Sequence, residues 1–161
     1  MKQFDSLGAF AAHLLTTATA EAVALHEGLV AAAVEVEKSA KGEIGTYQAA
    51  IGPFPAWAPL ADSTEDQKAR MGYPADSPLL ASGEMQESYA HEVAGLEAVI
   101  GTADPKALYH EIGTERMPPR PVLGPALLHN RERIERLIGE AAVAGILGGK
   151  LTSAQMGYEK T

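Results

Sequence analysis

The sequence predicts an α+β fold, because helix-like and strand-like apolar patterns occupy separate stretches of the chain. Apolar residues recur every three to four positions through the first 40 residues and again from 127 to 142, which is the period of an amphipathic helix. Between these stretches, β-favouring side chains flank a glycine at residue 95. With 161 residues, of which 46% are apolar, we expect a single domain over 1–161.

The first predicted element is a long helix within residues 1–40, which Asp5 or Ser6 can cap. The segment contains no proline and is rich in alanine, which favours helix. Gly28 marks a place where the helix can bend or break. One face carries small and apolar side chains that suggest close packing against a neighbouring element or subunit: Leu7, Ala11, Leu14, Ala18, Ala22, Leu25, Leu29, Ala33 and Val36.

Residues 41–78 hold most of the turn-forming residues and predict an extended, partly mobile loop or arm. Within it, Thr64 to Ala69 can form one helical turn. A loop of this length in a small domain is more often functional or disordered than passive, so an arm that embraces a partner is one interpretation. Its glycines and prolines are Gly42, Gly45, Gly52, Pro53, Pro55, Pro59, Gly72, Pro74 and Pro78.

Residues 79–124 are predicted to contain strands, a short helix and a proline-rich strand. Met85–Ala94 and Glu97–Thr102 flank a turn at Gly95, and a hairpin is the natural interpretation. We then expect a short helix over 104–112, with aspartate as its cap and proline at its first position. Met117–Pro121 has three prolines in five residues, so it must be extended.

The last predicted element is a helix over 125–150, followed by a tail over 151–161. Arginine and glutamate side chains from 131 to 136 are expected mostly on the solvent side. An apolar stripe marks the other face: Leu127, Leu128, Ile134, Leu137, Ile138, Ala141 and Ala142.

Charge is distributed unevenly along the chain. Residues 1–100 carry 14 acidic and 5 basic side chains, whereas residues 101–161 carry 7 acidic and 8 basic ones. A tight DNA-binding protein normally presents a basic patch, so the acidic part fits either simple solubility or a surface past which DNA slides. The chain has no cysteine, which excludes disulfides. The stretch 141–149 is too short and glycine-rich to cross a bilayer, so no membrane partner is expected.

A metal-hydrolase motif is suggested at first sight by HEIGT, in which Glu111 follows His110. The zinc motif needs a second histidine one helical turn later, and Thr114 stands there, preceded by Gly113. Phosphate-binding and dinucleotide-binding glycine motifs are absent from the sequence, and the five histidines lack the close spacing of metal ligands. We therefore expect no enzyme activity, no catalytic or metal-ligating residue and no cofactor.

The segment YHEIGTERMPPRPVLGPALLHNRERI resembles a signature of the tail-completion and neck (head-tail joining) proteins of long-tailed bacteriophages. Ile112, Pro119 and Val122 depart from that pattern. Upstream residues are similar to Mu-type virion-morphogenesis proteins, and the two resemblances together cover about residues 55–138. The matching residues are Tyr109, Glu111, Gly113, Thr114, Met117, Pro118, Arg120, Pro121, Leu123, Pro125 and Ala126, and upstream Trp57, Pro59, Leu60, Thr64, Lys68, Leu79, Leu80, Ser82, Gly83 and Ser88.

The proline-rich part of this signature is physically suited to docking, because a rigid strand loses little entropy when it binds. Arg120 offers a fixed fork of donors to a carboxylate, and Glu111 is a candidate partner within the subunit or across an interface. The alternative is that the segment is a connector in which Arg120 caps carbonyl groups. Tyr109 and Ile112 are expected in the core. The interface candidates are Trp57, Glu111, Gly113, Thr114, Met117, Pro118, Pro119, Arg120 and Pro121.

The resemblance implies that both long helices pack on one side of a small, mainly antiparallel sheet. It also implies a structural virion protein that forms a homo-oligomeric ring, most simply a hexamer, around the DNA channel. Its partners would be the head-connector or stopper protein and the tail-terminator or tube proteins. DNA would pass without specific binding, and the protein would reside in the virion and, during assembly, in the host cytoplasm.

Three other functions remain open from the sequence. The first is a tail-terminator protein that caps the tail tube. The second is a small metal-dependent hydrolase built on His110 and Glu111. The third is a helical adaptor unrelated to phages, because residues 1–40 carry no part of the phage signature.

Overall fold

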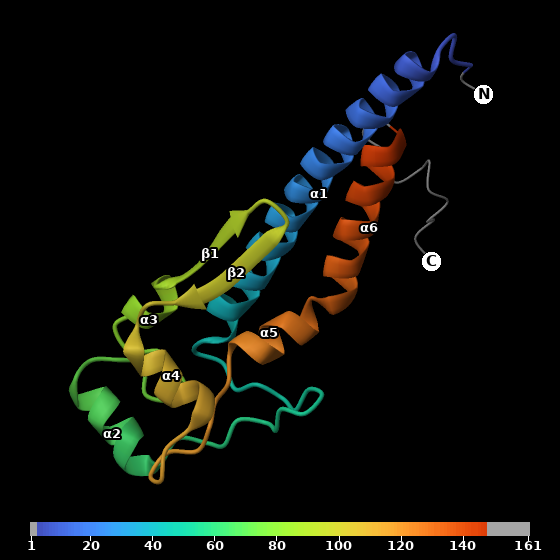
Figure 1. The fold of residues 1–161 in the computed structure, drawn as a ribbon. Coiled ribbons are helices and arrows are strands. Elements are labelled where there is room, and N and C mark those ends of the chain that lie inside the picture. The colour runs from blue at the N-terminus through green and yellow to red at the C-terminus, as the bar shows by residue number, and fades with distance from the viewer. Residues whose placement is uncertain (1–2, 148–161) are drawn as a thin grey trace. The chain divides into compact units, whose positions relative to one another are not determined.

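The computed structural model describes residues 3–147 (Figure 1). This part of the chain divides into two compact units, and the expectation of a single domain over 1–161 stays a prediction. The first unit contains residues 3–32, 93–98 and 133–147, and the second contains residues 33–92 and 99–132.

The fold class is α+β, as predicted, with six helices and one two-stranded antiparallel sheet in the described residues. The strands are consecutive, so the sheet is a simple hairpin. In chain order the elements are α1 (Leu7–Glu43), α2 (Asp62–Arg70), α3 (Glu84–Glu87), β1 (Tyr89–Ala94), β2 (Glu97–Thr102), α4 (Pro105–Ile112), α5 (Leu123–His129) and α6 (Arg131–Leu147).

The long N-terminal helix is confirmed as α1, which runs for 37 residues. Ser6 caps it, because its side-chain oxygen accepts a hydrogen bond of 3.1 Å from the backbone N–H of Ala9. The helix continues through Gly28 without a break. A Cβ at Gly28 would lie 2.5 Å from the Cβ of Ala141, so this glycine lets α6 approach α1 closely in the first unit.

The apolar face of α1 is buried only in its second half. Ala33, Val36 and Ala40 are buried, whereas Leu7 is 82% exposed and Leu14 is 52% exposed. The expectation of one continuous packed stripe is therefore wrong for the N-terminal turns. Over 7–20 the helix carries no Asp, Glu, Lys or Arg, and its side chains are apolar apart from His13 and three threonines.

One window of 18 residues in α1 is apolar enough, by length and composition alone, to cross a membrane, and none of that window is buried within the described structure. The stretch over 141–149 was therefore not the most membrane-like segment of the chain. Alanine and threonine between the larger apolar residues of α1 conceal this property in the sequence. The expectation of no membrane partner stays a prediction.

The stretch over 41–78 has more structure than an extended arm. Residues 41–43 belong to α1, and an antiparallel bridge joins Ile51 to Phe54. The single turn predicted at Thr64–Ala69 is the nine-residue helix α2, because the four charges Asp62, Glu65, Lys68 and Arg70 complement the dipole at its two ends.

The predicted hairpin is confirmed over Tyr89–Ala94 and Glu97–Thr102, with Gly95 in its turn at φ 59°. The strand predicted to begin at Met85 begins four residues later. Residues 84–87 form the short helix α3 instead, and the buried side chain of Met85 anchors that helix.

The C-terminal helix predicted over 125–150 is two helices, α5 and α6, interrupted at Asn130. Asn130 ends α5, because its side-chain amide donates to the carbonyl of Ala126 at 2.8 Å. Pro125 lies in the first turn of α5, where its missing N–H has no intrahelical partner to lose. Residues 148–150 and the predicted tail over 151–161 lie outside the described residues.

The core of the second unit forms where α1, the hairpin, α4 and α5 contribute side chains. Its most enclosed residues include Ala40, Tyr89, Ala107, Val122 and Ala126. The ring of Phe54 packs on Gly124 of α5, where a Cβ would lie 2.2 Å from the ring. The absence of a side chain at Gly124 therefore allows the arm to lie against α5. In the same stretch Trp57 hydrogen-bonds to the carbonyl of Pro121, which places the arm beside the proline-rich segment.

Candidate functional site

The phage-like signature begins on α4, which forms as its residues predict. Asp104 caps the helix by accepting a 2.9 Å hydrogen bond from the N–H of Lys106, and Pro105 occupies the first turn. Ala107 is buried, and three apolar neighbours on the same helix are exposed. These are Leu108 at 60%, Tyr109 at 56% and Ile112 at 68%. The expectation that Tyr109 and Ile112 lie in the core is therefore wrong.

Gly113 ends α4 with φ 72° and ψ 179°, a conformation that is open essentially to glycine alone. A Cβ there would lie 2.8 Å from the nitrogen of Pro119 and 2.9 Å from the carbonyl oxygen of Met117. Thr114 and Met117 then pair as an antiparallel bridge, with N–H to oxygen distances of 2.8 Å and 3.2 Å. The signature glycine and threonine thus fold the chain back on itself.

Arg120 is 5% exposed and binds backbone, not a carboxylate. Its Nη2 donates to the carbonyl oxygens of Ala58 at 2.9 Å and Pro59 at 3.1 Å, and its Nε donates to Ala58 at 3.3 Å. Within residues 3–147 it forms no ion pair. The predicted pairing of Arg120 with Glu111 is wrong within the subunit, and the alternative that Arg120 caps carbonyls is confirmed; a pairing across an interface stays a prediction.

Glu111 serves as the cap of α5. Its Oε1 accepts hydrogen bonds of 2.9 Å from the backbone N–H groups of both Val122 and Leu123. Val122 occupies the cap position of α5 but supplies no side-chain oxygen, so a carboxylate from α4 takes that role. One carboxylate oxygen of Glu111 is therefore engaged with backbone N–H groups of α5. No group of three or more potential metal ligands occurs among the described residues.

Trp57 completes this arrangement from the arm. It is buried, and its indole Nε1 donates to the carbonyl oxygen of Pro121 at 3.2 Å. We call residues 57–59, Glu111 and 120–123 the Arg120 junction. The structure brings these predicted interface residues together inside one unit, where they hold the arm, α4 and α5 to each other.

The other interface candidates lie at the edge of the junction. Thr114, Pro118 and Pro119 are exposed, and Gly113 and Met117 are partly exposed. Sequence reasoning missed Leu108, because a single leucine beside the signature matched no element of it. The signal that could have found it is its position, one residue before Tyr109 and four before Ile112, on the same side of a helix.

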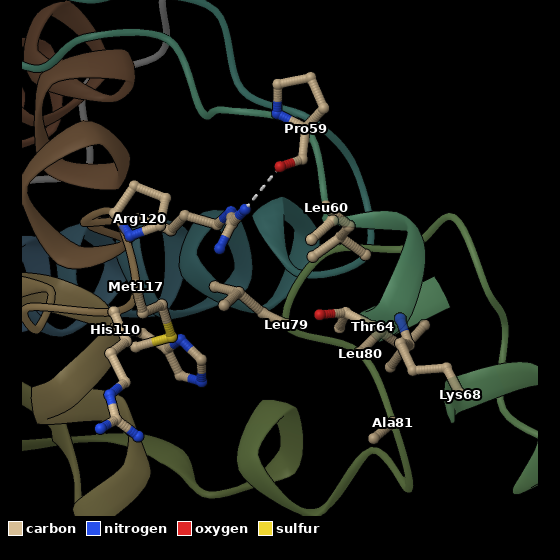
Figure 2. Close-up of a pocket in the computed structure, with 13 residues that line it drawn as sticks. Pro59, Leu60, Thr64, Lys68, Leu79, Leu80, Ala81, His110, Met117 and Arg120 are labelled. Atoms are coloured by element: carbon tan, nitrogen blue, oxygen red, sulfur yellow. Dashed lines mark hydrogen bonds between the residues drawn. The ribbon is translucent and has the colours of Figure 1, made fainter. Parts of the chain in front are cut away.

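A pocket of about 340 Å³ opens beside the junction (Figure 2). In Figure 2, Arg120 and Lys68 lie on opposite sides of Leu60, Leu79 and Leu80. Its walls are mostly apolar, its only charged side chains are basic, and no Asp or Glu lines it. The full lining is Pro59, Leu60, Ala61, Thr64, Lys68, Leu79, Leu80, Ala81, His110, Arg116, Met117, Pro118 and Arg120.

Burial lowers the pKa of two ionisable groups that line the pocket. Desolvation, followed by the charge of Arg120, lowers the pKa of His110 below its usual 6.5. The Nδ1 of His110 is buried and has no hydrogen-bond partner within the described residues. Desolvation also lowers the pKa of Lys68, whose Nζ donates to the carbonyl oxygen of Ser77. At neutral pH the His110 ring is therefore neutral and has an unused ring nitrogen beside the pocket.

Outside the pocket, one further buried carboxyl lies near the junction. Glu43 is 5% exposed; its Oε1 lies 3.0 Å from Nδ1 of His129, and its Oε2 has no partner within the described residues. Burial raises the pKa of Glu43 above its usual range, and the charge of Glu111 acts in the same direction. The interaction with His129 opposes this shift.

Comparison with known proteins adds no identification. The chain matches no family model, no curated protein and no solved structure.

Proposed function

We propose that this chain is a structural protein of the phage neck, which completes the tail and joins it to the head connector as a ring around the DNA channel. The observation that carries the proposal is the apolar platform of Leu108, Tyr109 and Ile112, exposed on the helix that begins the phage-like signature. The junction uses Glu111 and Arg120 of that signature internally, so the exposed apolar side chains of Tyr109 and Ile112, with their neighbour Leu108, are the surface that α4 offers to a partner.

Clusters of exposed large apolar side chains on a soluble protein mark interaction surfaces. The platform lies on a helix whose two ends are fixed, by Asp104 at the start and by the Gly113 turn at the end. A partner can therefore bind it without first ordering it, which reduces the entropic cost of association.

A ring follows if the platform binds a different surface of the next copy, because a head-to-tail interface whose rotation closes gives a closed ring. We propose a hexamer, with the acidic first hundred residues favouring passage of DNA without adhesion. The partners above and below the ring are the head-connector or stopper protein and the tail-terminator or tube proteins.

The test is the mass of the full chain in solution, measured by light scattering after size exclusion over a range of concentrations. We expect a species near six subunits, and the double variant Tyr109→Ser with Ile112→Ser should shift it to smaller species while the helical content stays unchanged. Val99→Thr is the matched control, because Val99 is 61% exposed but lies on β2. A double variant that assembles like the parent chain would show that the platform is not the interface between subunits.

The second candidate function is a tail terminator, which the same platform supports equally well. The two functions differ in the partner, so the full chain is immobilised and offered purified tube protein and purified head-connector protein separately. Retention of the connector alone supports the neck role, and retention of the tube alone supports the terminator role.

A further inference from the structure

We infer that the pocket beside Arg120 is a binding site for a carboxylate attached to an apolar body. The inference goes beyond the proposed function and concerns the single chain, so it does not depend on ring assembly. It rests on a buried cation without a counter-charge, on an orphaned ring nitrogen, and on the chemistry of the pocket walls.

The buried cation is Arg120. A charge that is removed from water is normally paired with an opposite charge, because neutral carbonyls compensate only part of the lost hydration. Arg120 is 5% exposed, and its guanidinium hydrogen-bonds only to the carbonyls of Ala58 and Pro59 within the described residues. Its Nη1 donates to no group in residues 3–147. A bound anion would supply the missing partner.

Two neighbours strengthen the anion assignment. Arg116 lines the same pocket and is exposed, and it forms no ion pair among the described residues. His110 also lines the pocket, and its buried Nδ1 has no hydrogen-bond partner among the described residues, so the ring has polar capacity that the chain itself leaves unused. Lys68 is less available, because it is bonded to Ser77 and feels the charges of Asp76 and Glu65.

The apolar body follows from the walls. Leucine, methionine and proline side chains form most of the lining, and a small polyanion such as phosphate would leave them uncovered. Leu79 reaches the pocket from a left-handed backbone conformation with φ 63°, which is unusual for a bulky residue and costs conformational energy. A site of about 340 Å³ accommodates a carboxylate with a chain of several carbons, or a leucine beside a glutamate in a peptide.

The experiment is calorimetric titration of the full chain with five probes. Hexanoate and acetyl-leucyl-glutamate amide carry the carboxylate, and hexanamide and acetyl-leucyl-glutamine amide are their neutral counterparts; inorganic phosphate is the fifth. We expect the carboxylates to bind at least about tenfold more tightly than their neutral counterparts, since charge-assisted bonds to guanidinium groups are lost in the latter. Tighter binding of hexanoate indicates a small free acid as the natural ligand, and tighter binding of the peptide indicates a docking segment of a protein.

The variants replace exposed residues, so that a change in binding is not caused by a loss of folding. Arg116→Gln removes an exposed cation of the pocket and should weaken carboxylate binding about fivefold to tenfold, with an unchanged melting curve. Arg70→Gln is the matched control, because Arg70 is exposed on α2 outside the pocket and should leave binding unchanged. Equal binding of neutral and charged probes, phosphate binding as tight as hexanoate, an Arg116→Gln variant with unaltered affinity, or no binding at all overturns the inference.

The result is independent of the assembly test. A chain that is monomeric by light scattering but binds hexanoate refutes the ring and keeps the pocket. A hexamer that binds none of the five probes keeps the ring and refutes the pocket.

Discussion

The Arg120 junction and the N-terminal turns of α1, residues 7–20, differ in which side chains they bury: the junction buries a charged one, and the α1 turns expose apolar ones. The junction buries the guanidinium of Arg120 and half-buries the carboxylate of Glu111, and both groups hydrogen-bond to backbone groups, up to 62 residues away in sequence. The α1 turns carry no charged side chain and leave large apolar residues in solvent. Residues that resemble an interface motif thus hold the fold together, while residues patterned like a core stripe remain uncovered.

The residue types of a motif therefore do not reveal whether its side chains face the core or the solvent. A buried charge needs polar groups fixed around it, so its position depends strongly on how the chain folds. An exposed apolar side chain contributes little to the stability of the unit that carries it, and its role depends on a partner.

The largest effect is expected for Arg120→Ala. The variant removes three hydrogen bonds from a charged donor group to the carbonyls of Ala58 and Pro59, so we expect the free energy of unfolding to fall by about 2–3 kcal/mol. Urea denaturation followed by circular dichroism measures the change. Arg70→Ala, at an exposed position of α2, should stay within about 0.5 kcal/mol of the parent chain. A loss in Arg120→Ala no larger than that of this control would mean that the junction is not structural.

A smaller loss, of about 2 kcal/mol, is expected for Gly113→Ala, because the added Cβ meets backbone atoms and the φ of 72° is unfavourable for alanine. Gly139→Ala gives a control of opposite sign. Gly139 lies in α6 with no atom within 4 Å of an added Cβ, so alanine should stabilise the chain by about 0.5–1 kcal/mol. Thermal unfolding of the two variants side by side measures both, and destabilisation by both would contradict this account.

The smallest effect is expected for Leu14→Ser and Leu15→Ser, where 52% and 72% of the side chain is exposed. Measured at a concentration where the chain is monomeric, the free energy of unfolding should change by less than about 0.5 kcal/mol. Val36→Ala on the same helix is 3% exposed and should cost about 1–2 kcal/mol. A loss in the two serine variants comparable to that of Val36→Ala would show that the N-terminal turns are covered within the chain.

Local chemistry made several elements predictable. The cap at Asp104 followed by Pro105, the turn at Gly95 and the long alanine-rich helix all depend on residues close in sequence, and all three formed as expected. The break at Asn130 was missed, because the apolar period continues across it and only the side-chain bond to Ala126 ends the helix.

The candidate site was predictable as a segment but not as an arrangement. The signature directed attention to Trp57, Glu111 and Arg120, which do meet. Their partners could not be read from the sequence, because each binds backbone atoms, and every residue has those. The pocket escaped prediction for the same reason, since its lining combines residues 59–81 with residues 110–120.

By itself, the sequence determined the fold class and the positions of most helices and strands, because apolar period, caps and turn glycines act over a few residues. It also set the uneven charge of the chain. Only the tertiary structure decided that Arg120 and Glu111 serve different elements and that Leu108, Tyr109 and Ile112 face outward. Those outcomes depend on which distant carbonyls, N–H groups and apolar surfaces are brought within bonding distance, and packing alone fixes that.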